Sequence, residues 1–495
     1  MSLSPRTSLH ESLHDQPLEI MNFGNGDYVC LATGFVDSST TSSFRSGIPK
    51  LDTDAIAEIM KHIKGPQELS FLMRTCHVIY AIGVFPLLQL PIYIRTNSSL
   101  VSFRNFLFAD PCGSTRRFEI IRSLNIHLPQ LEVEGASSLA EILARSSNLR
   151  KITISNSNHF FDLSPDANQV LANLTRLIKV TLKFVELKAI SWLQQTKSPL
   201  SELNIIMPGQ DDKDLFPVFS RFSNSLTKLD ISDVRLTKFN AKFVYLRDLK
   251  IHTQHPISAV LIAHAFPNLE SLDITIDNGV GDVVHQHAVN SADLSSSGLS
   301  FPSLQCLKGS PEDLFSAGIE PRAKIFRIDD LGDWNIEWFF KLLRRVQPST
   351  LGLPINTGSF EDISLVAFLE SLFKEHLPTQ RLCLFLHFGD EKNKVVKKFI
   401  NAFPNTIKGT SFKSLYLGIT HDEWKSCLQT VDVVTLIAKI SIMSPDTQMI
   451  TVRLRPGCKT SISVNKEYRR TGKTFRDLRE ELQKRSSFLA DNTAS

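Results

Sequence analysis

The sequence predicts an α/β fold: a curved repeat solenoid with a parallel sheet inside and helices outside, preceded by a small unit of three helices. Three observations lead to this prediction. A six-residue pattern, apolar-x-x-apolar-x-apolar, recurs seven times between residues 118 and 280. Stretches with helical spacing of apolar residues stand between its copies, and residues 46–95 have helical spacing without the pattern. Because one strand and one helix cannot bury their apolar sides alone, a regular series of such units predicts a solenoid.

The recurring pattern predicts the strands. Its first copy reads Ile121-Arg-Ser-Leu124-Asn-Ile126, and later copies follow at steps of 20 to 28 residues. The fourth positions of the seven copies are Leu124, Ile152, Val180, Leu203, Leu229, Leu249 and Leu272. Apolar residues at the fourth and sixth positions, with a polar residue between them, are typical of a strand with one buried face.

Beyond Ile274 the pattern continues in a weaker form to about residue 460. Candidate strands contain the pairs Leu304/Leu307, Ile325/Ile328, Leu351/Leu353, Leu382/Leu384, Leu415/Leu417 and Val452/Leu454. Helices are expected over 138–145, 257–266, 336–346, 362–373 and 394–403. The polar interval 279–300 is expected to form a loop at one edge of the sheet.

The helical unit over residues 46–95 is predicted as three short helices. Thr53 or the residue before it can cap the first helix, which has apolar residues at helical spacing. Gly65-Pro66 separates this helix from the second one. The third is expected over Val78–Gly83 and to end before Pro86, because proline disrupts a helix interior.

Both ends of the chain are polar. Residues 1–45 are rich in Ser and Thr and are expected to be disordered, because they offer little apolar surface to bury. Residues 466–495 are expected to form a basic helix and tail, with eight Lys/Arg against four Asp/Glu between positions 466 and 485. The alternatives for this tail are contact with an acidic partner, a role in nuclear import, and a solvated terminal helix that caps the last repeat. The net charge of +4 is too small to suggest bulk nucleic-acid binding.

Cysteine usage and hydropathy predict a protein of the cytoplasm or nucleus. The seven cysteines are scattered and form no Cys-x-x-Cys pair, which fits reduced thiols. Cys76 is expected to be buried packing rather than a nucleophile. The longest uncharged run, 78–94, is shorter than the ~20 residues of a membrane helix, so no membrane partner is expected.

No grouped catalytic, cofactor or metal motif is present, so the protein is not expected to be an enzyme. Gly472-Lys473-Thr474 resembles the end of a phosphate-binding loop, but Glu467 stands where that loop needs glycine. His285 and His287 lack a third ligand nearby, and both are expected to be solvated. A protein that is monomeric by itself and binds other proteins is the remaining expectation.

The third and fifth residues of each pattern are expected on the concave face of the sheet. The candidate target-binding residues are Lys151, Thr153, Lys179, Thr181, Glu202, Asn204, Lys228, Asp230, Asp248, Lys250 and Asp273. Because these residues mix both signs of charge, a protein target is favoured over nucleic acid. The alternative for each position is a merely solvated sheet face.

Two resemblances sharpen these expectations. The repeat pattern resembles the irregular leucine-rich repeats of intracellular proteins. Residues 48–94 resemble an F-box: the stretch Leu51-Asp-Thr-Asp54-Ala-Ile56 begins a helix rich in Ile, and Thr75-Cys76-His-Val-Ile-Tyr80 follows. Asp52 stands where that family has proline. An F-box followed by leucine-rich repeats is a recurring architecture, here with the F-box-like domain at 46–95 and the solenoid at 96–465, regular over 118–280 and irregular over 300–460.

The resemblance implies the substrate-receptor subunit of a cullin-based, SCF-type ubiquitin ligase. Its helices would bind a Skp-type adaptor and thereby the cullin complex, and its solenoid would bind a protein target. The implied adaptor-binding residues are Leu51, Ile56, Ile59, Met60, Ile63, Leu69 and Leu72, of which about half are expected to form the core of the unit instead. The alternative function is a leucine-rich-repeat scaffold whose helices only cap the solenoid, with no role in ubiquitin transfer.

Overall fold

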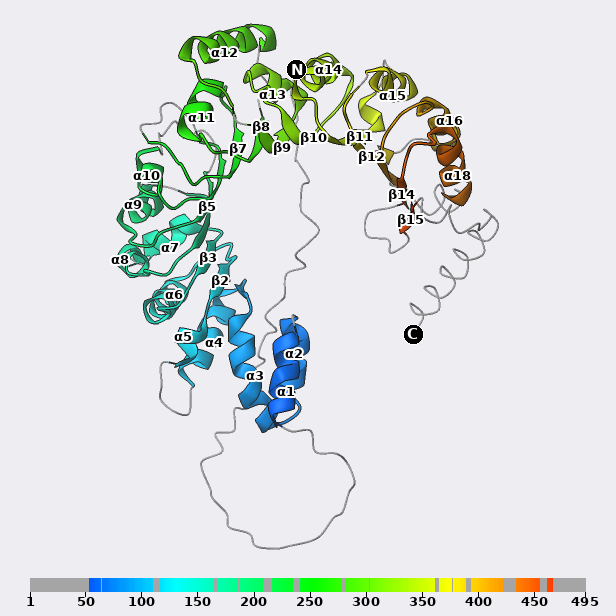
Figure 1. The fold of residues 1–495 in the computed structure, drawn as a ribbon. Coiled ribbons are helices and arrows are strands. Elements are labelled where there is room, and N and C mark those ends of the chain that lie inside the picture. Colours follow the sequence, from blue (N-terminus) through cyan, green and yellow to red (C-terminus); the bar gives the residue numbers. More distant parts are fainter. Residues whose placement is uncertain are drawn as a thin grey trace, which may run out of the picture. The chain divides into compact units, whose positions relative to one another are not determined.

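A computed structural model describes the chain over residues 53–63, 65–109, 116–163, 167–185, 187–207, 216–234, 241–277, 282–301, 303–360, 365–375, 377–388, 393–421, 433–454 and 461–465. Leu51 and the expected disordered and basic ends lie outside these residues. The chain divides into two compact units, residues 1–211 and 212–495. Figure 1 shows the elements of both units.

The described part of the first unit starts with three helices, as predicted. They are α1 (Thr53–His62), α2 (Pro66–Met73) and α3 (His77–Gln89). Both α1 and α2 pack on α3, which in turn contacts α5 of the repeat region. The third helix does not end before Pro86 as expected. Val84 and Leu88 on either side of the proline are buried at helical spacing, and this packing favours a continuous helix despite the missing backbone donor.

The repeats of the first unit alternate strands and helices (Figure 1). The strands are β1 (Ile92–Ile94), β2 (Ser123–Ile126), β3 (Lys151–Ile154), β4 (Lys179–Lys183) and β5 (Glu202–Ile206). The helices are α4 (Asn97–Phe108), α5 (Arg116–Ile120), α6 (Val133–Arg145), α7 (Ser157–Leu163), α8 (Ala167–Ala172) and α9 (Leu187–Gln195). All four strand pairings from β1 to β5 are parallel.

The second unit continues the alternation. Its strands are β6 (Lys228–Ser232), β7 (Asp248–Thr253), β8 (Ser271–Ile276), β9 (Leu304–Gly309), β10 (Ala323–Ile328), β11 (Thr350–Asn356), β12 (Arg381–Phe388), β13 (Ser414–His421), β14 (Met449–Leu454) and β15 (Ser461–Asn465). Its helices are α10 (Phe216–Ser220), α11 (Ala259–Ala265), α12 (Val283–Ser297), α13 (Pro311–Ser316), α14 (Ile336–Val346), α15 (Leu365–Lys374), α16 (Asn393–Thr406) and α18 (Val433–Met443), with short 3-10 turns at Asp333–Asn335 and Thr357–Ser359. Within this unit the strands lie on the inner side of an arc and the helices on the outer side (Figure 1).

The strand register confirms the sequence pattern. Leu124 pairs with Ile152, Ile152 with Val180 and Val180 with Leu203, so the fourth positions align across the first unit. The same row in the second unit runs through Leu229, Leu249, Leu272, Leu307, Phe326, Leu351, Leu382, Leu415 and Ile450. Pairing is parallel from β6 to β14, and β15 returns antiparallel to β14. Each unit is therefore an α/β arrangement of the solenoid type.

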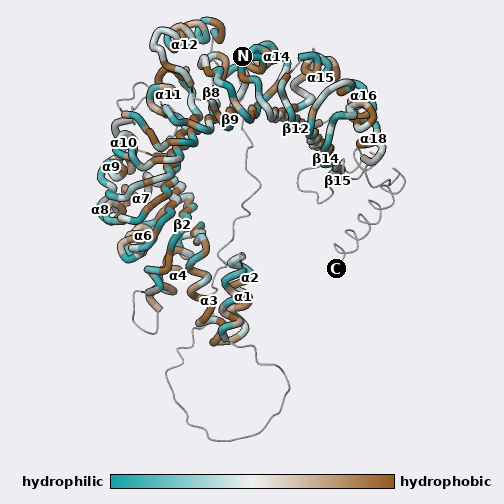
Figure 2. Tube along the Cα trace, viewed as in Figure 1, coloured by the Kyte–Doolittle hydropathy of each residue, from teal (hydrophilic) through white to brown (hydrophobic). Residues whose placement is uncertain are grey.

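The core of each unit lies between the strands and the helices. Leu124 and Ile126 of β2, for example, are buried together with Leu139, Ile142 and Leu143 of α6. Apolar segments recur along the strands and are dense in α3 (Figure 2). None of the helices in the described ranges is both long and apolar enough to cross a membrane.

The interval 279–300 contains a helix, and the expectation of a loop was wrong. The side chain of Asp282 accepts a hydrogen bond from the backbone N–H of His285 and caps the start of α12. Gly298, with a φ of 64°, ends the helix in the left-handed conformation. The helix has a weak apolar face, so hydrophobic periodicity could not reveal it. Its insertion explains why Leu307 follows Leu272 at a longer step than the earlier copies.

Candidate protein-docking surfaces

The three N-terminal helices divide the expected adaptor-binding residues between core and surface. Met60 and Leu69 are fully buried within the helical unit. Ile59 is 52% exposed, whereas Ile56, Ile63 and Leu72 are half-buried. Met60 therefore holds the helices together, and Ile59 lies on the outside.

The same helices expose apolar residues that the sequence reasoning missed. Phe71, Val78 and Phe85 are each more than half exposed, at 55%, 52% and 52%. Val78 and Phe85 lie one heptad apart on α3, a helix that is apolar nearly all round. Such a helix needs cover on every side, and this feature of the sequence could have indicated the exposed surface. Cys76, expected to be buried, is exposed where α3 begins.

In the first unit, the expected target-binding residues line up across three strands. Lys151 pairs with Lys179 and Lys179 with Glu202 in one row. Thr153, Thr181 and Asn204 form the next row, two residues further along each strand. The Nζ of Lys179 lies 2.9 Å from Oε2 of Glu202. These side chains are more exposed than the apolar residues between them, which are buried.

In the second unit, the expected residues form two further rows. Lys228 pairs with Asp248, and Asp230, Lys250 and Asp273 lie side by side on β6 to β8. Burial raises the pKa of Asp230, an effect opposed by Lys250 and Lys228. This part of the sheet face is mixed in charge, with three aspartates and two lysines.

Lys308 on β9 is the next residue of this row. Its Nζ lies 3.0 Å from Oδ2 of Asp273 and 3.1 Å from Oδ1 of Asp329. Burial lowers the pKa of Lys308, but the carboxylates of Asp329 and Asp273 more than offset this effect and leave the pKa raised. The three side chains join β8, β9 and the residue that directly follows β10 on the exposed face.

Beyond Lys308 the same face changes in chemistry. Its row continues through Arg327 on β10, Gly352 on β11, Cys383 on β12 and Tyr416 on β13. The rings of Tyr416 and Phe385 pack with their centroids 5.2 Å apart. The sequence reasoning assigned no site residues here, because the weaker pattern left the register undefined. The strand pairing supplies that register.

A polar cluster lies at the junction of α12, α13 and α14. Asn290, which is 3% exposed, donates from Nδ2 to the carbonyl oxygens of Ile257, over 3.2 Å, and Ser316, over 2.8 Å. These contacts attach α12 to the neighbouring repeats and hold it on the outer side of the unit.

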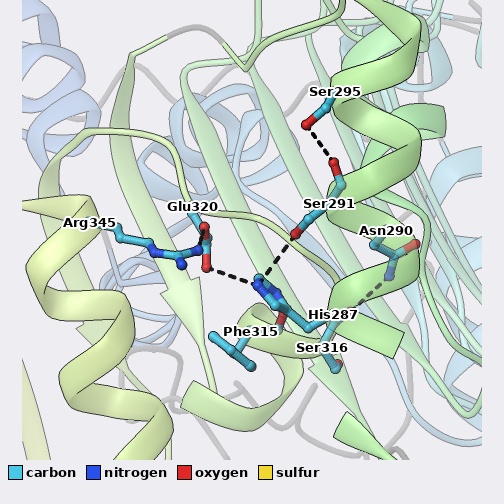
Figure 3. Close-up of polar contacts among 8 residues, drawn as sticks. All are labelled: His287, Asn290, Ser291, Ser295, Phe315, Ser316, Glu320 and Arg345. Carbon is cyan, nitrogen blue, oxygen red and sulfur yellow. Dashed lines mark hydrogen bonds and ion pairs between the residues drawn. The ribbon is translucent and has the colours of Figure 1, made fainter. Parts of the chain in front are cut away.

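His287 belongs to the same cluster, so the expectation that its side chain is solvated was wrong. Its ring stacks on Phe315 with centroids 3.9 Å apart, and Nδ1 donates to the carbonyl oxygen of Phe315. Nε2 lies 3.8 Å from Oε1 of Glu320, whose other oxygen pairs with Arg345 (Figure 3). The neighbouring His285 does not belong to this cluster. Within the described part of the chain, no group of three or more His, Cys, Asp or Glu side chains could hold a metal ion.

The fold therefore defines an α/β repeat protein with an N-terminal helical unit. No protein-family model and no curated protein matches the chain. Among solved structures, one match is a Bacteroides fragilis protein, whose crystal structure was determined by the Northeast Structural Genomics Consortium. The sequence identity is 12%, the match covers 66% of this chain and 73% of the other, and the TM-score is 0.28. A similarity at this level carries no argument about function.

Proposed function

We propose that this protein is the substrate-receptor subunit of an SCF-type ubiquitin ligase, with an F-box-like domain and irregular leucine-rich repeats. In this function, α1 to α3 bind a Skp-type adaptor, and the repeats bind a protein target. The receptor supplies no catalytic group. It raises the effective concentration of the target near the activated ubiquitin.

The observation that carries this proposal is the exposed apolar surface of the helical unit. Ile59, Phe71, Val78 and Phe85 are each more than half exposed, although this small unit needs apolar burial for its own stability. Exposed apolar side chains grouped on one small unit are typical of a protein-binding site. A partner that covers them would gain about 25 cal/mol of binding free energy for each Å² of apolar area that it buries.

The alternative function is a repeat scaffold in which the helices only cap the solenoid. A cap would bury the apolar side chains of α1 against the repeats. Ile59 is exposed, and α1 packs on α3. This arrangement favours adaptor binding over the scaffold.

The direct test is binding of a purified Skp-type adaptor by calorimetry. The variants are Ile59→Asp and Phe71→Asp, with Val133→Asp as the matched control, since Val133 on α6 is 68% exposed and apolar. Circular dichroism checks that each variant is folded. Binding by the wild-type chain should be lost or weakened by about 30-fold in the first two variants, which is the scale of an interface hot spot, and unchanged in the control. No binding by the wild-type chain, or an equal loss in the control, would refute the proposal.

A further inference from the structure

The concave face of the second unit is divided in charge. On β6 to β8 it carries Asp230, Asp248 and Asp273 beside two lysines. Strands β10 to β14 contain no Asp or Glu at all. Three arginines occupy this second stretch instead, and two aromatic residues lie between them. We call Arg327, Arg381, Phe385, Tyr416 and Arg453 the basic–aromatic face.

The strand register brings these five residues together. Arg327 and Arg381 both lie close enough to the thiol of Cys383 to act on it electrostatically. Phe385 on β12 pairs with Gly418 on β13, and Gly418 pairs with Arg453 on β14. The aromatic pair and the arginines therefore occupy adjacent positions of one sheet.

Glycine residues shape this surface. A Cβ atom on Gly418 would lie 3.2 Å from Cδ1 of Phe385 and 3.3 Å from Cε1 of Tyr416, so both rings lean over this position. A Cβ atom on Gly352 would lie 3.4 Å from Cγ of Arg327, whose aliphatic stem lies over that glycine. Phe385 remains 47% exposed. The surface thus presents an aromatic ring rimmed by cationic groups.

Two of the three arginines are fully accessible to a ligand. Arg327 and Arg381 are exposed, and within the residues that the structure describes none of the three arginines forms an ion pair. The Nε of Arg453 is buried and has no hydrogen-bond partner there. The exposed guanidinium groups of Arg327 and Arg381 can donate charge-assisted hydrogen bonds to a carboxylate ligand. By contrast, Asp273 and Asp329 are already bound by Lys308.

We propose that the basic–aromatic face binds a short acidic peptide segment in an extended conformation, with one large apolar side chain against Phe385 and Tyr416. Five strands at a spacing of about 4.8 Å span ~19 Å, which corresponds to about six extended residues. The inference deepens the proposed function, because the peptide would belong to the target. A nucleic acid fits less well, since a longer polyanion would run onto a stretch of the same face where Asp230 and Asp273 alternate with Lys250 and Lys308.

The test uses the full-length protein without any adaptor, so that its outcome is independent of adaptor binding. A phage library of random twelve-residue peptides is selected on the wild-type chain. The most enriched peptide is then synthesised with a fluorescent label for anisotropy titrations. A fluorescent twelve-residue uridine RNA is titrated in parallel.

Three variants identify the binding surface. Arg381→Glu and Phe385→Ala alter the basic–aromatic face, and Lys250→Glu makes the same charge change on the mixed-charge part of the concave face. Both Arg381 and Lys250 are exposed, so neither charge reversal disturbs the core. Circular dichroism compares the folding of all three variants.

We expect the enriched peptides to combine several Asp or Glu with one aromatic or large aliphatic residue. Arg381→Glu and Phe385→Ala should weaken binding by about tenfold or more, whereas Lys250→Glu should change it by less than about twofold. The proposal fails if no peptide is enriched, if the enriched peptides are neutral or basic, or if Lys250→Glu weakens binding as much as Arg381→Glu. Tighter binding of the RNA, lost in Arg381→Glu, would assign this face to nucleic acid and would also overturn the proposal.

Discussion

The carboxylate of Asp313 accepts a hydrogen bond from the backbone N–H of Ile276, over a distance of 2.9 Å. Asp313 belongs to α13 and is 4% exposed, while Ile276 is the last residue of β8. Burial raises the pKa of Asp313 to about 7, although the hydrogen bonds from Ile276 and Ser310 oppose the shift; Glu312 and Asp277 add to it. One buried side chain thus ties an outer helix to the inner sheet and titrates near neutral pH.

The raised pKa of Asp313 predicts a pH-dependent stability. Between about pH 4 and pH 7 the folded chain keeps a proton on this carboxyl that the unfolded chain has lost. Because the folded state then binds more protons, its free energy of unfolding falls as the pH rises, by at most about 1.4 kcal/mol per pH unit. Asp313→Asn removes this titration and keeps an oxygen for the N–H of Ile276. Its melting temperature relative to wild type should therefore increase from pH 5 to pH 8.

Equal changes with pH in both proteins would contradict this prediction. Glu312→Gln is the control for the adjacent carboxyl, whose pKa burial also raises. Since Glu312 is less buried than Asp313, the relative melting temperature of Glu312→Gln should change less over the same pH range.

The hydrogen bonds of Asn290 are expected to stabilise the attachment of α12 to the neighbouring repeats. Asn290→Ala leaves the carbonyl oxygens of Ile257 and Ser316 without their side-chain donor in a buried position. We expect it to lower the free energy of unfolding by about 2–4 kcal/mol. Ser296→Ala, at an exposed position of the same helix, should change it by less than about 0.5 kcal/mol. Urea denaturation measures both, and hydrogen exchange of α12 should accelerate only in the Asn290 variant.

Replacing either of two glycines of the second unit by alanine should lower stability, but by different amounts. Gly309 has a φ of 155°, and a Cβ atom there would lie 2.5 Å from the backbone oxygen of Ile274. Gly309→Ala should therefore destabilise the protein by about 2 kcal/mol or more. Gly298 has a φ of 64° with nothing within 4 Å, so Gly298→Ala should cost only about 1 kcal/mol. Thermal melts that ranked the two variants in the opposite order would exclude this explanation.

Lys308 predicts a measurable coupling with Asp273. A double-mutant cycle with Lys308→Met and Asp273→Asn should give a coupling free energy of about 1 kcal/mol, because these side chains are only partly exposed. The coupling should shrink in about 0.5 M salt. The exposed pair Arg247 and Glu270, whose charged atoms lie 3.5 Å apart, is the control and should give a coupling near zero. Similar coupling free energies in both pairs would contradict the prediction that partial burial strengthens the interaction of Lys308 with Asp273.

The sequence predicted the repeats well where the signal was local. The alternation around Leu124, Ile152 and Val180 identified strands, because one buried face imposes a period of two. The helix over 336–346 was predicted with the bounds that the structure gives. The helix α12 was missed, since Asn290 and His287 attach it through polar contacts that leave no apolar periodicity. The same limit applies to Pro86, where tertiary packing of Val84 and Leu88 continues a helix that local propensity would end.

The sequence by itself determined the α/β class, the parallel strands and the polar rows on their exposed faces, because these follow from the spacing of neighbouring residues. Only the tertiary structure decided that Met60 is buried and Ile59 exposed. It also decided that Arg327, Arg381 and Phe385 share one surface, although up to 58 residues separate them along the chain. The physical reason is that strand register and helix packing depend on contacts between distant residues, and the spacing within a single repeat carries no information about them.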